Sequence, residues 1–100
     1  MADAAVTYRV IAGRVNPDGT KVSGEGFESS REDKGKYHIT FRPAFDAFYG
    51  CAVSQIGFED GHNDVRDGAL PYQIQNGSMH VITGGGAKDD RPFTFVVVGL

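Results

Sequence analysis

The stretch that decides the fold runs from Lys36 to Phe41 and reads Lys-Tyr-His-Ile-Thr-Phe. Its apolar residues, Tyr37, Ile39 and Phe41, alternate with polar ones, as in a β-strand that has one face on a core and the other in solvent. Pro43 ends the run, because proline has no N–H to donate to a neighbouring strand. The segment therefore predicts a half-buried β-strand.

Short runs of the same kind fill the rest of the chain, which has 100 residues and 14 glycines. Turn-forming residues bound almost every run, and turn signals that recur roughly every 8–12 residues are typical of sandwiches and barrels. A chain of this length has room for one domain. We therefore predict a single all-β domain over residues 1–100, a compact antiparallel β-sandwich of about seven to eight strands with no helix. The expected strands span 6–15, 20–29, 36–41, 49–58, 70–75 and 92–100, with one more around Met79 and Val81.

Turn chemistry predicts how these strands connect. Asn16-Pro17-Asp18-Gly19 places proline at the second position of a turn, where its fixed φ is favourable. Asn76-Gly77 predicts a type I′ hairpin, because both residues tolerate a positive φ. In the run 20–29 the apolar residues change face, so Gly24 and Gly26 are expected to form a β-bulge that restores the alternation.

Composition excludes several classes of function. The net charge is -3 and the pI about 5.5, which disfavours nucleic-acid binding. No apolar run approaches the roughly 18 residues of a membrane span. The single cysteine, Cys51, excludes an intrachain disulfide and a paired-cysteine metal site. The first residues lack the basic and apolar regions of a signal peptide, so we expect cytoplasmic synthesis, compatible with later release or with particle association.

No catalytic motif is found in the sequence. It contains no nucleophile elbow, phosphate-binding loop or helical His-Glu-x-x-His pattern. His38 and His80 are expected on outer strand faces, and Cys51 is expected to pack as a small apolar residue. Glu25 and Glu28 have opposite strand parity and make a poor pair for glycoside hydrolysis. We therefore expect a protein that is not an enzyme and needs no cofactor.

The segment 59–68 is the most polar part of the chain and is the candidate ligand-binding loop. Loops at the end of a sandwich carry binding residues on a rigid scaffold, which favours contact with a glycan or a peptide. The side-chain oxygens of the loop are of the type that coordinates calcium. Their spacing departs from the EF-hand pattern, however, so no metal is expected. The candidate binding residues are Asp60, His62, Asn63, Asp64, Arg66 and Asp67.

Three segments, 10–20, 24–27 and 35–41, together resemble small β-sandwich modules of bacterial and phage proteins. Such modules form the tips of tail fibres or lectin-like appendages, and several of them are trimers. The closing run Phe93-Thr-Phe-Val-Val-Val-Gly is similar to the last strand of H-type lectin domains. This resemblance implies a jelly-roll-like or H-type lectin-like sandwich with carbohydrate-binding activity.

The function expected from these features is that of a non-enzymatic module. The first interpretation is a small oligomeric β-sandwich that recognises a glycan or a surface partner. The alternative is a scaffold or assembly subunit that acts only through protein–protein contacts. A small hydrolase or isomerase is a third interpretation, and it would need two or three polar groups that face each other in a cleft.

The terminal run predicts self-association. Phe93, Phe95 and Val97 take one face of this strand while Val96 and Val98 take the other, and a strand that is apolar on both faces is normally covered on both. Ile82 and the small residues at 50, 52 and 54 are expected to extend the second apolar patch. We expect either that a second copy covers the patch, in a dimer or a trimer, or that the aromatic corner 45–49 folds over it within one chain.

The polar loop gives a first test. Changing both Asp64 and Arg66 to alanine should leave the free energy of unfolding within about 0.5 kcal/mol of the wild-type value, because exposed loop side chains contribute little to stability. Glycan binding should fall in the same variant. Thermal denaturation and a glycan-binding assay measure the two effects, and a large drop in melting temperature would instead give the loop a structural role.

Overall fold

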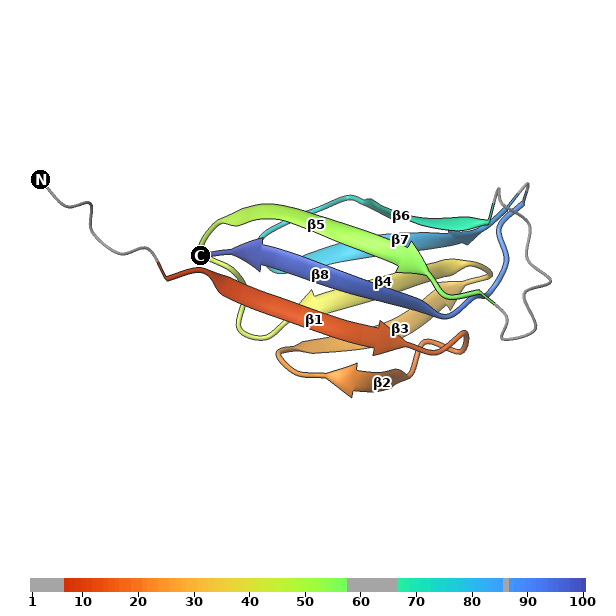
Figure 1. The fold of residues 1–100 in the computed structure, drawn as a ribbon, viewed down its shortest axis with the longest axis horizontal. Coiled ribbons are helices and arrows are strands. Elements are labelled where there is room, and N and C mark those ends of the chain that lie inside the picture. Colours follow the sequence, from red (N-terminus) through yellow and green to blue (C-terminus); the bar gives the residue numbers. More distant parts are fainter. Residues whose placement is uncertain (1–6, 58–66, 86) are drawn as a thin grey trace, which may run out of the picture.

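The computed structural model describes residues 7–57, 67–85 and 87–100, which form eight antiparallel strands in two packed sheets (Figure 1). The first sheet has the order β2-β1-β8-β5 and the second the order β3-β4-β7-β6. The strand bounds are β1 Arg9–Val15, β2 Lys21–Gly24, β3 Phe27–Asp33, β4 Lys36–Phe41, β5 Phe48–Gln55, β6 Gly68–Tyr72, β7 Ser78–Gly84 and β8 Phe93–Gly99. The all-β antiparallel sandwich predicted from the sequence is confirmed. The described residues contain no helix, and hence none that could cross a membrane.

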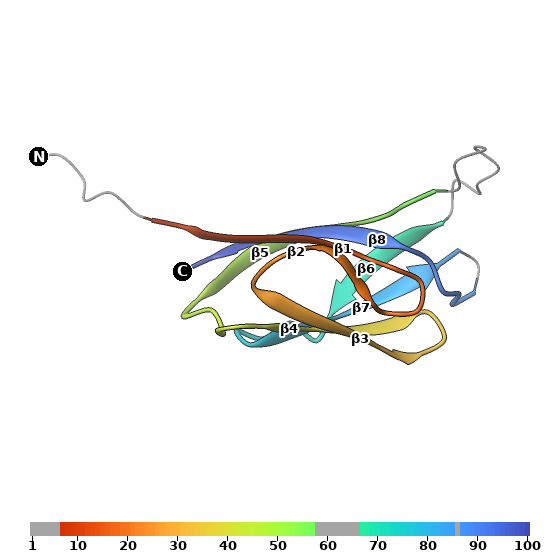
Figure 2. The ribbon, with the colours of Figure 1, turned by 90° about the horizontal axis from the view of Figure 1, so that it is seen from below.

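The chain changes sheet four times, between β2 and β3, β4 and β5, β5 and β6, and β7 and β8. Figure 2 shows the result as two layers, one containing β1, β5 and β8 and the other β3, β4 and β7. From β3 to β8 the strand order matches the A-B-E-D and C-F order of immunoglobulin-type sandwiches, with β1 beside β8. Strand order alone carries no statement about function.

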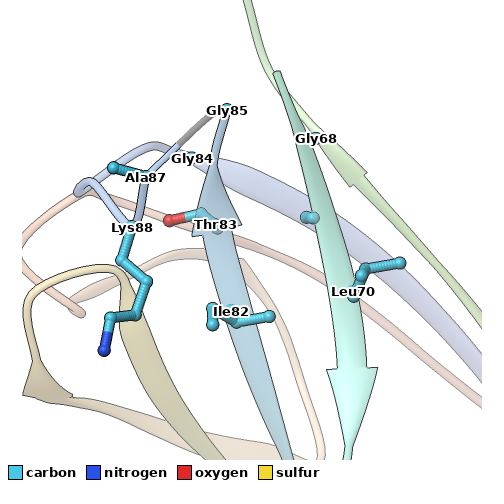
Figure 3. A pocket seen from close by; sticks show the side chains of 9 residues that line it. Gly68, Leu70, Ile82, Thr83, Gly84, Gly85, Ala87 and Lys88 are labelled. Atoms are coloured by element: carbon cyan, nitrogen blue, oxygen red, sulfur yellow. The ribbon is translucent and has the colours of Figure 1, made fainter. Parts of the chain in front are cut away.

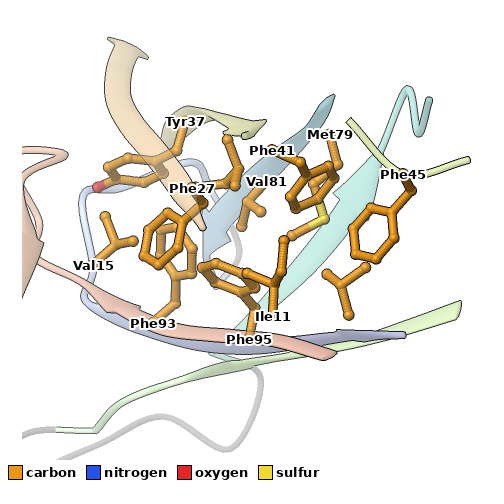
Figure 4. Packing of buried hydrophobic residues seen from close by; sticks show 12 residues of the cluster. Ile11, Val15, Phe27, Tyr37, Phe41, Phe45, Met79, Val81, Phe93 and Phe95 are labelled. Atoms are coloured by element: carbon orange, nitrogen blue, oxygen red, sulfur yellow. The ribbon is translucent and has the colours of Figure 1, made fainter. Parts of the chain in front are cut away.

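The core lies between the two layers and is built mainly from alternate residues of β1, β4, β7 and β8, with one phenylalanine from β3 and one from the segment before β5 (Figure 4). In β1 the buried residues are Ile11 and Val15, so Val10 and Ala12 face outward. In β4 and β8 the buried residues are the predicted ones. The core cluster consists of Ile11, Val15, Phe27, Tyr37, Ile39, Phe41, Phe45, Met79, Val81, Phe93, Phe95 and Val97.

The predicted bulge at Gly24 and Gly26 is wrong, because the chain passes from one sheet to the other at this point. β2 ends at Gly24 in the first sheet, and β3 begins at Phe27 in the second. Both glycines have positive φ, 103° and 85°. A Cβ at Gly24 would also lie against the carbonyl oxygen of Ala12, so the crossing needs glycine for space as well as for conformation.

The two predicted turns form, but one has a different conformation. The N–H of Gly19 donates to the carbonyl of Asn16 at 2.9 Å, as expected for the first turn. Gln75 and Ser78 close the Asn76-Gly77 hairpin with two backbone hydrogen bonds. Neither Asn76 nor Gly77 has a positive φ, so the predicted type I′ turn is wrong. The Asn76 side chain is instead held by the chain at the start of β5. Its Oδ1 accepts from the N–H of Phe48 at 3.0 Å, and its Nδ2 donates to the carbonyl of Asp46 at 3.2 Å.

A carboxylate joins the β3–β4 turn to the segment before β8. Asp90 accepts hydrogen bonds from Arg31 Nε at 3.0 Å and from the N–H of Gly35 at 2.8 Å. The hydroxyl of Tyr37 donates to the carbonyl of Pro17 at 2.7 Å and lies 3.5 Å from Asp90. The hydrogen bond from Arg31, followed by that from Gly35, lowers the pKa of Asp90 below its ordinary value of 3.8. Asp90 therefore stabilises the fold in its charged form.

Asp90→Asn should lower the free energy of unfolding at pH 7 by about 1 kcal/mol, since a neutral amide accepts these bonds more weakly. A group whose pKa is lower in the folded protein than in the unfolded protein stabilises the fold at pH values above its unfolded-state pKa. This stabilisation is lost as the pH falls through the folded-state pKa. The difference in free energy of unfolding between wild type and variant should therefore persist from pH 7 to about pH 4 and shrink below pH 3.8.

Urea denaturation at a series of pH values measures this difference. Glu25→Gln, in the exposed crossing between β2 and β3, is the matched control and should show no such dependence. A loss of unfolding free energy in Asp90→Asn that stays constant to the lowest pH measured would contradict the role of the charge.

Candidate functional site

Most of the candidate ligand-binding loop lies outside the described residues. This applies to Asp60, His62, Asn63, Asp64 and Arg66. Asp67 is described: it is half-buried directly before β6, and its carboxylate lies close to the backbone of Gly85. The glycan contact predicted for this loop therefore stays a prediction.

A hollow of about 580 Å³ lies at one end of β6 and β7, where Gly68 and Gly85 are among the residues that line it (Figure 3). Its walls are mostly small or apolar, and Lys88 is the charged residue that lines it. The hydroxyl of Thr83 donates to the carbonyl of Asp89 at 2.6 Å and is thereby engaged within the fold. The hollow offers an apolar surface, and its described lining residues include no paired nucleophile and base.

The second sheet carries a row of stacked rings on its outer face. His38 and His80 are direct cross-strand partners, with ring centroids 4.7 Å apart, and Tyr72 continues the row at 5.2 Å from His80. Glu32 lies 2.5 Å from Nδ1 of His80. Burial raises the pKa of Tyr72. The outward placement of both histidines confirms the sequence prediction, but their pairing was missed because register cannot be read from either strand alone.

This row does not extend to a metal site. Within the described ranges, no group of three or more His, Cys, Asp or Glu side chains is arranged to hold a metal ion. The rings therefore serve as a polar, aromatic surface of the second sheet.

The first sheet presents the opposite chemistry on its outer face, which we call the uncharged face. Two cross-strand rows form it. Val10, Val98 and Gly50 make one row, and Ala12, Val96 and Ala52 make the next. Val10 is 59% exposed and Val96 44% exposed, so these two valines stand in solvent in the single chain, while Val98 is half-buried. The next row is polar and holds Arg14, Thr94 and Ser54.

Tyr8 and Tyr49 extend the uncharged face at the end opposite Arg14. Their rings meet edge to face, with centroids 6.1 Å apart, and both remain more than half exposed. The small residues Gly50 and Ala52 leave a shallow groove of about 400 Å³ between Tyr49 and the valines of β8. The face therefore has an apolar floor with a tyrosine at its rim.

The aromatic corner does not cover this face. Phe45 is 3% exposed and packs against Phe41 and Phe48 at the end of the core. Phe45 and Phe48 of the corner complete the core instead, while Tyr49 lies only at the rim of the face and leaves Val96 44% exposed. The alternative in which the corner covers the terminal strand is therefore wrong. Ile82 was also misplaced, since it lies on the outer face of the second sheet beside Leu70.

Cys51 lies on the inner side of β5 and is half-buried against the core. Burial raises the pKa of its thiol above the ordinary value of 9.0. This agrees with a cysteine that packs as a small apolar residue, because a reactive cysteine needs a lowered pKa. Cys51 is nevertheless useful as the single thiol on this edge of the sandwich.

Comparison of the chain with models of known protein families, with curated proteins and with solved structures finds no match.

The thiol of Cys51 gives a test of this packing. In the folded protein it should react with a disulfide reagent more slowly than in urea at the same pH, because the thiolate is the reactive form. The rate should reach half its maximum at a pH above 9.0 in the folded state. Stopped-flow absorbance measures both rates, and equal rates in the folded and unfolded protein would show that Cys51 is freely accessible.

Proposed function

We propose that the protein is a non-enzymatic structural module that acts as a homo-oligomer, with the uncharged face covered by another copy of the chain. The observation that carries this proposal is the exposure of an apolar, charge-free surface on β1, β8 and β5, three adjacent strands of the first sheet. Contiguous exposed apolar surface on a soluble protein marks an interaction site.

The composition of this face favours protein contact over catalysis. Interface centres are depleted in charged residues, and the floor of this face carries none, while tyrosine is enriched in interfaces generally and two tyrosines lie at its rim. Neither described hollow holds a nucleophile with an adjacent base. These features support the assembly interpretation over a hydrolase or an isomerase.

Glycan recognition is a separate part of the functional hypothesis and rests on the loop 59–68. It is tested independently of assembly by a broad glycan panel. Binding that is lost in the Asp64→Ala, Arg66→Ala double variant would support a lectin-like module. Absence of binding across the panel would leave the assembly subunit alone.

Assembly is tested by a charge placed at the centre of the uncharged face. Wild-type protein should have a mass above the 10.8 kDa of one chain at micromolar concentration. Val96→Glu should shift it to a smaller species, because an unpaired carboxylate is costly to bury in an interface. Light scattering after size exclusion measures the mass, and far-ultraviolet circular dichroism checks that the strands persist.

Leu70→Glu is the matched control. Leu70 is 67% exposed on the outer face of the second sheet, so the same charge replaces an exposed apolar side chain away from the proposed interface. Its mass should equal that of the wild type. A wild-type mass of 10.8 kDa, or an equal loss of mass in both variants, would contradict the proposal.

A further inference from the structure

The four edge strands of the sandwich differ sharply in how they are protected from pairing with another chain. Unpaired edges invite such pairing unless short length, charge or proline blocks it. β2 has only four residues, β3 carries four charged residues among seven, and β6 contains Pro71. β5 has eight residues, Phe-Tyr-Gly-Cys-Ala-Val-Ser-Gln, with neither a charge nor a proline.

The outer edge of β5 forms no strand pairing within the described ranges, although β6 packs close to β5. Among the described strands, β5 pairs with β8 alone, and its register is regular from Gly50 to Gln55. The N–H of Ile56 donates to the carbonyl of Pro92, toward the β8 side. Because successive residues of a strand direct their N–H and C=O to alternate sides, Cys51 and Val53 direct theirs away from β8.

The ends of β5 fix the length of the free edge. At one end the N–H of Phe48 is held by Asn76, and at the other the Oε1 of Gln55 accepts from the N–H of Gly84 at 3.1 Å. The segment 49–54 lies between these two contacts. It is long enough for a short antiparallel pairing centred on Ala52.

We infer that β5 pairs with β5 of a second copy about a two-fold axis near Ala52, joining the two first sheets into one eight-stranded sheet. Cys51 then lies opposite Val53 of the partner subunit, and Val53 opposite Cys51 of the partner subunit. Each of these two pairs exchanges both of its N–H and C=O groups. A like-for-like pairing is favoured because this edge brings no charge to the contact, although each chain carries a net charge of -3.

This inference rests on the proposed self-association and gives its geometry. Three strands of about five residues present roughly 240 Å² in projection, at a spacing of about 4.8 Å and a rise of about 3.3 Å per residue. A stable interface buries about 800 Å² on each partner. The uncharged face of one copy is therefore small, whereas pairing through β5 joins two such faces side by side and doubles the surface.

The edge is tested by removing one N–H. Val53→Pro deletes an N–H that makes no hydrogen bond to β8. Val53→Ala is the matched control, because it loses side-chain packing but keeps the N–H. Val53→Pro should have the mass of one chain, 10.8 kDa, while Val53→Ala keeps the wild-type mass. A folded Val53→Pro protein with the wild-type mass overturns the inference.

The native thiol gives a second readout that needs no change in β5. In the proposed pair the two Cys51 residues are diagonal neighbours on the same face, with Cα atoms about 7–8 Å apart. A short bismaleimide should therefore produce a covalent dimer of the wild type and also of Val96→Glu, and none of Cys51→Ser. Stacking through the uncharged faces alone would leave the thiols on opposite sides of two sheets, beyond this reach.

The outcomes separate the two proposals. An oligomeric wild type in which Cys51 takes up the reagent without forming a cross-link overturns the edge pairing and leaves the proposed function standing, with three-fold or face-to-face assembly in its place. A monomeric wild type overturns the proposed function itself. If Val53→Pro fails to fold, the cross-link alone decides the edge pairing.

Discussion

The contact between Phe27 and Phe95 joins the two sheets, and much of the sandwich depends on it. The rings meet edge to face with centroids 4.8 Å apart, one from each sheet. They can do so only because a glycine lies beside them: a Cβ at Gly13 would overlap the ring of Phe27. Gly24 stands against the same ring, and Lys21 places its ammonium 5.1 Å from it. A single aromatic residue thus fixes the positions of β1, β2, β3 and β8.

The sequence predicts the parts of this arrangement that depend on local alternation. Tyr37, Ile39 and Phe41 are assigned to the core because polar residues separate them, and the same reasoning succeeds for Phe93 and Phe95. It fails where the chain leaves a sheet. The glycines at 24 and 26 look like a bulge because both a bulge and a crossing need positive φ, and only the pairing of distant strands distinguishes them.

The candidate sites show the same limit. A pattern of apolar residues on both sides of β8 indicates that its second face is unusual, but it cannot say which other strands share that face. The structure adds Val10, Ala12 and the small residues of β5, and it moves Ile82 to the opposite sheet. The pairing of His38 with His80 depends on register, which no local feature of either strand encodes.

The position of β8 between β1 and β5 has a consequence for the time course of folding. β1 lies near the start of the chain and β8 near its end, yet they pair over their whole length, from Arg9 with Gly99 to Val15 with Phe93. Pairing of such distant segments is slow, because the intervening loop must be closed first. During synthesis β1 and β5 have no shared neighbour until residues 93–99 are made. The uncharged face needs β1, β8 and β5 side by side, so it is complete only once residues 93–99 have been made and have paired with both neighbours.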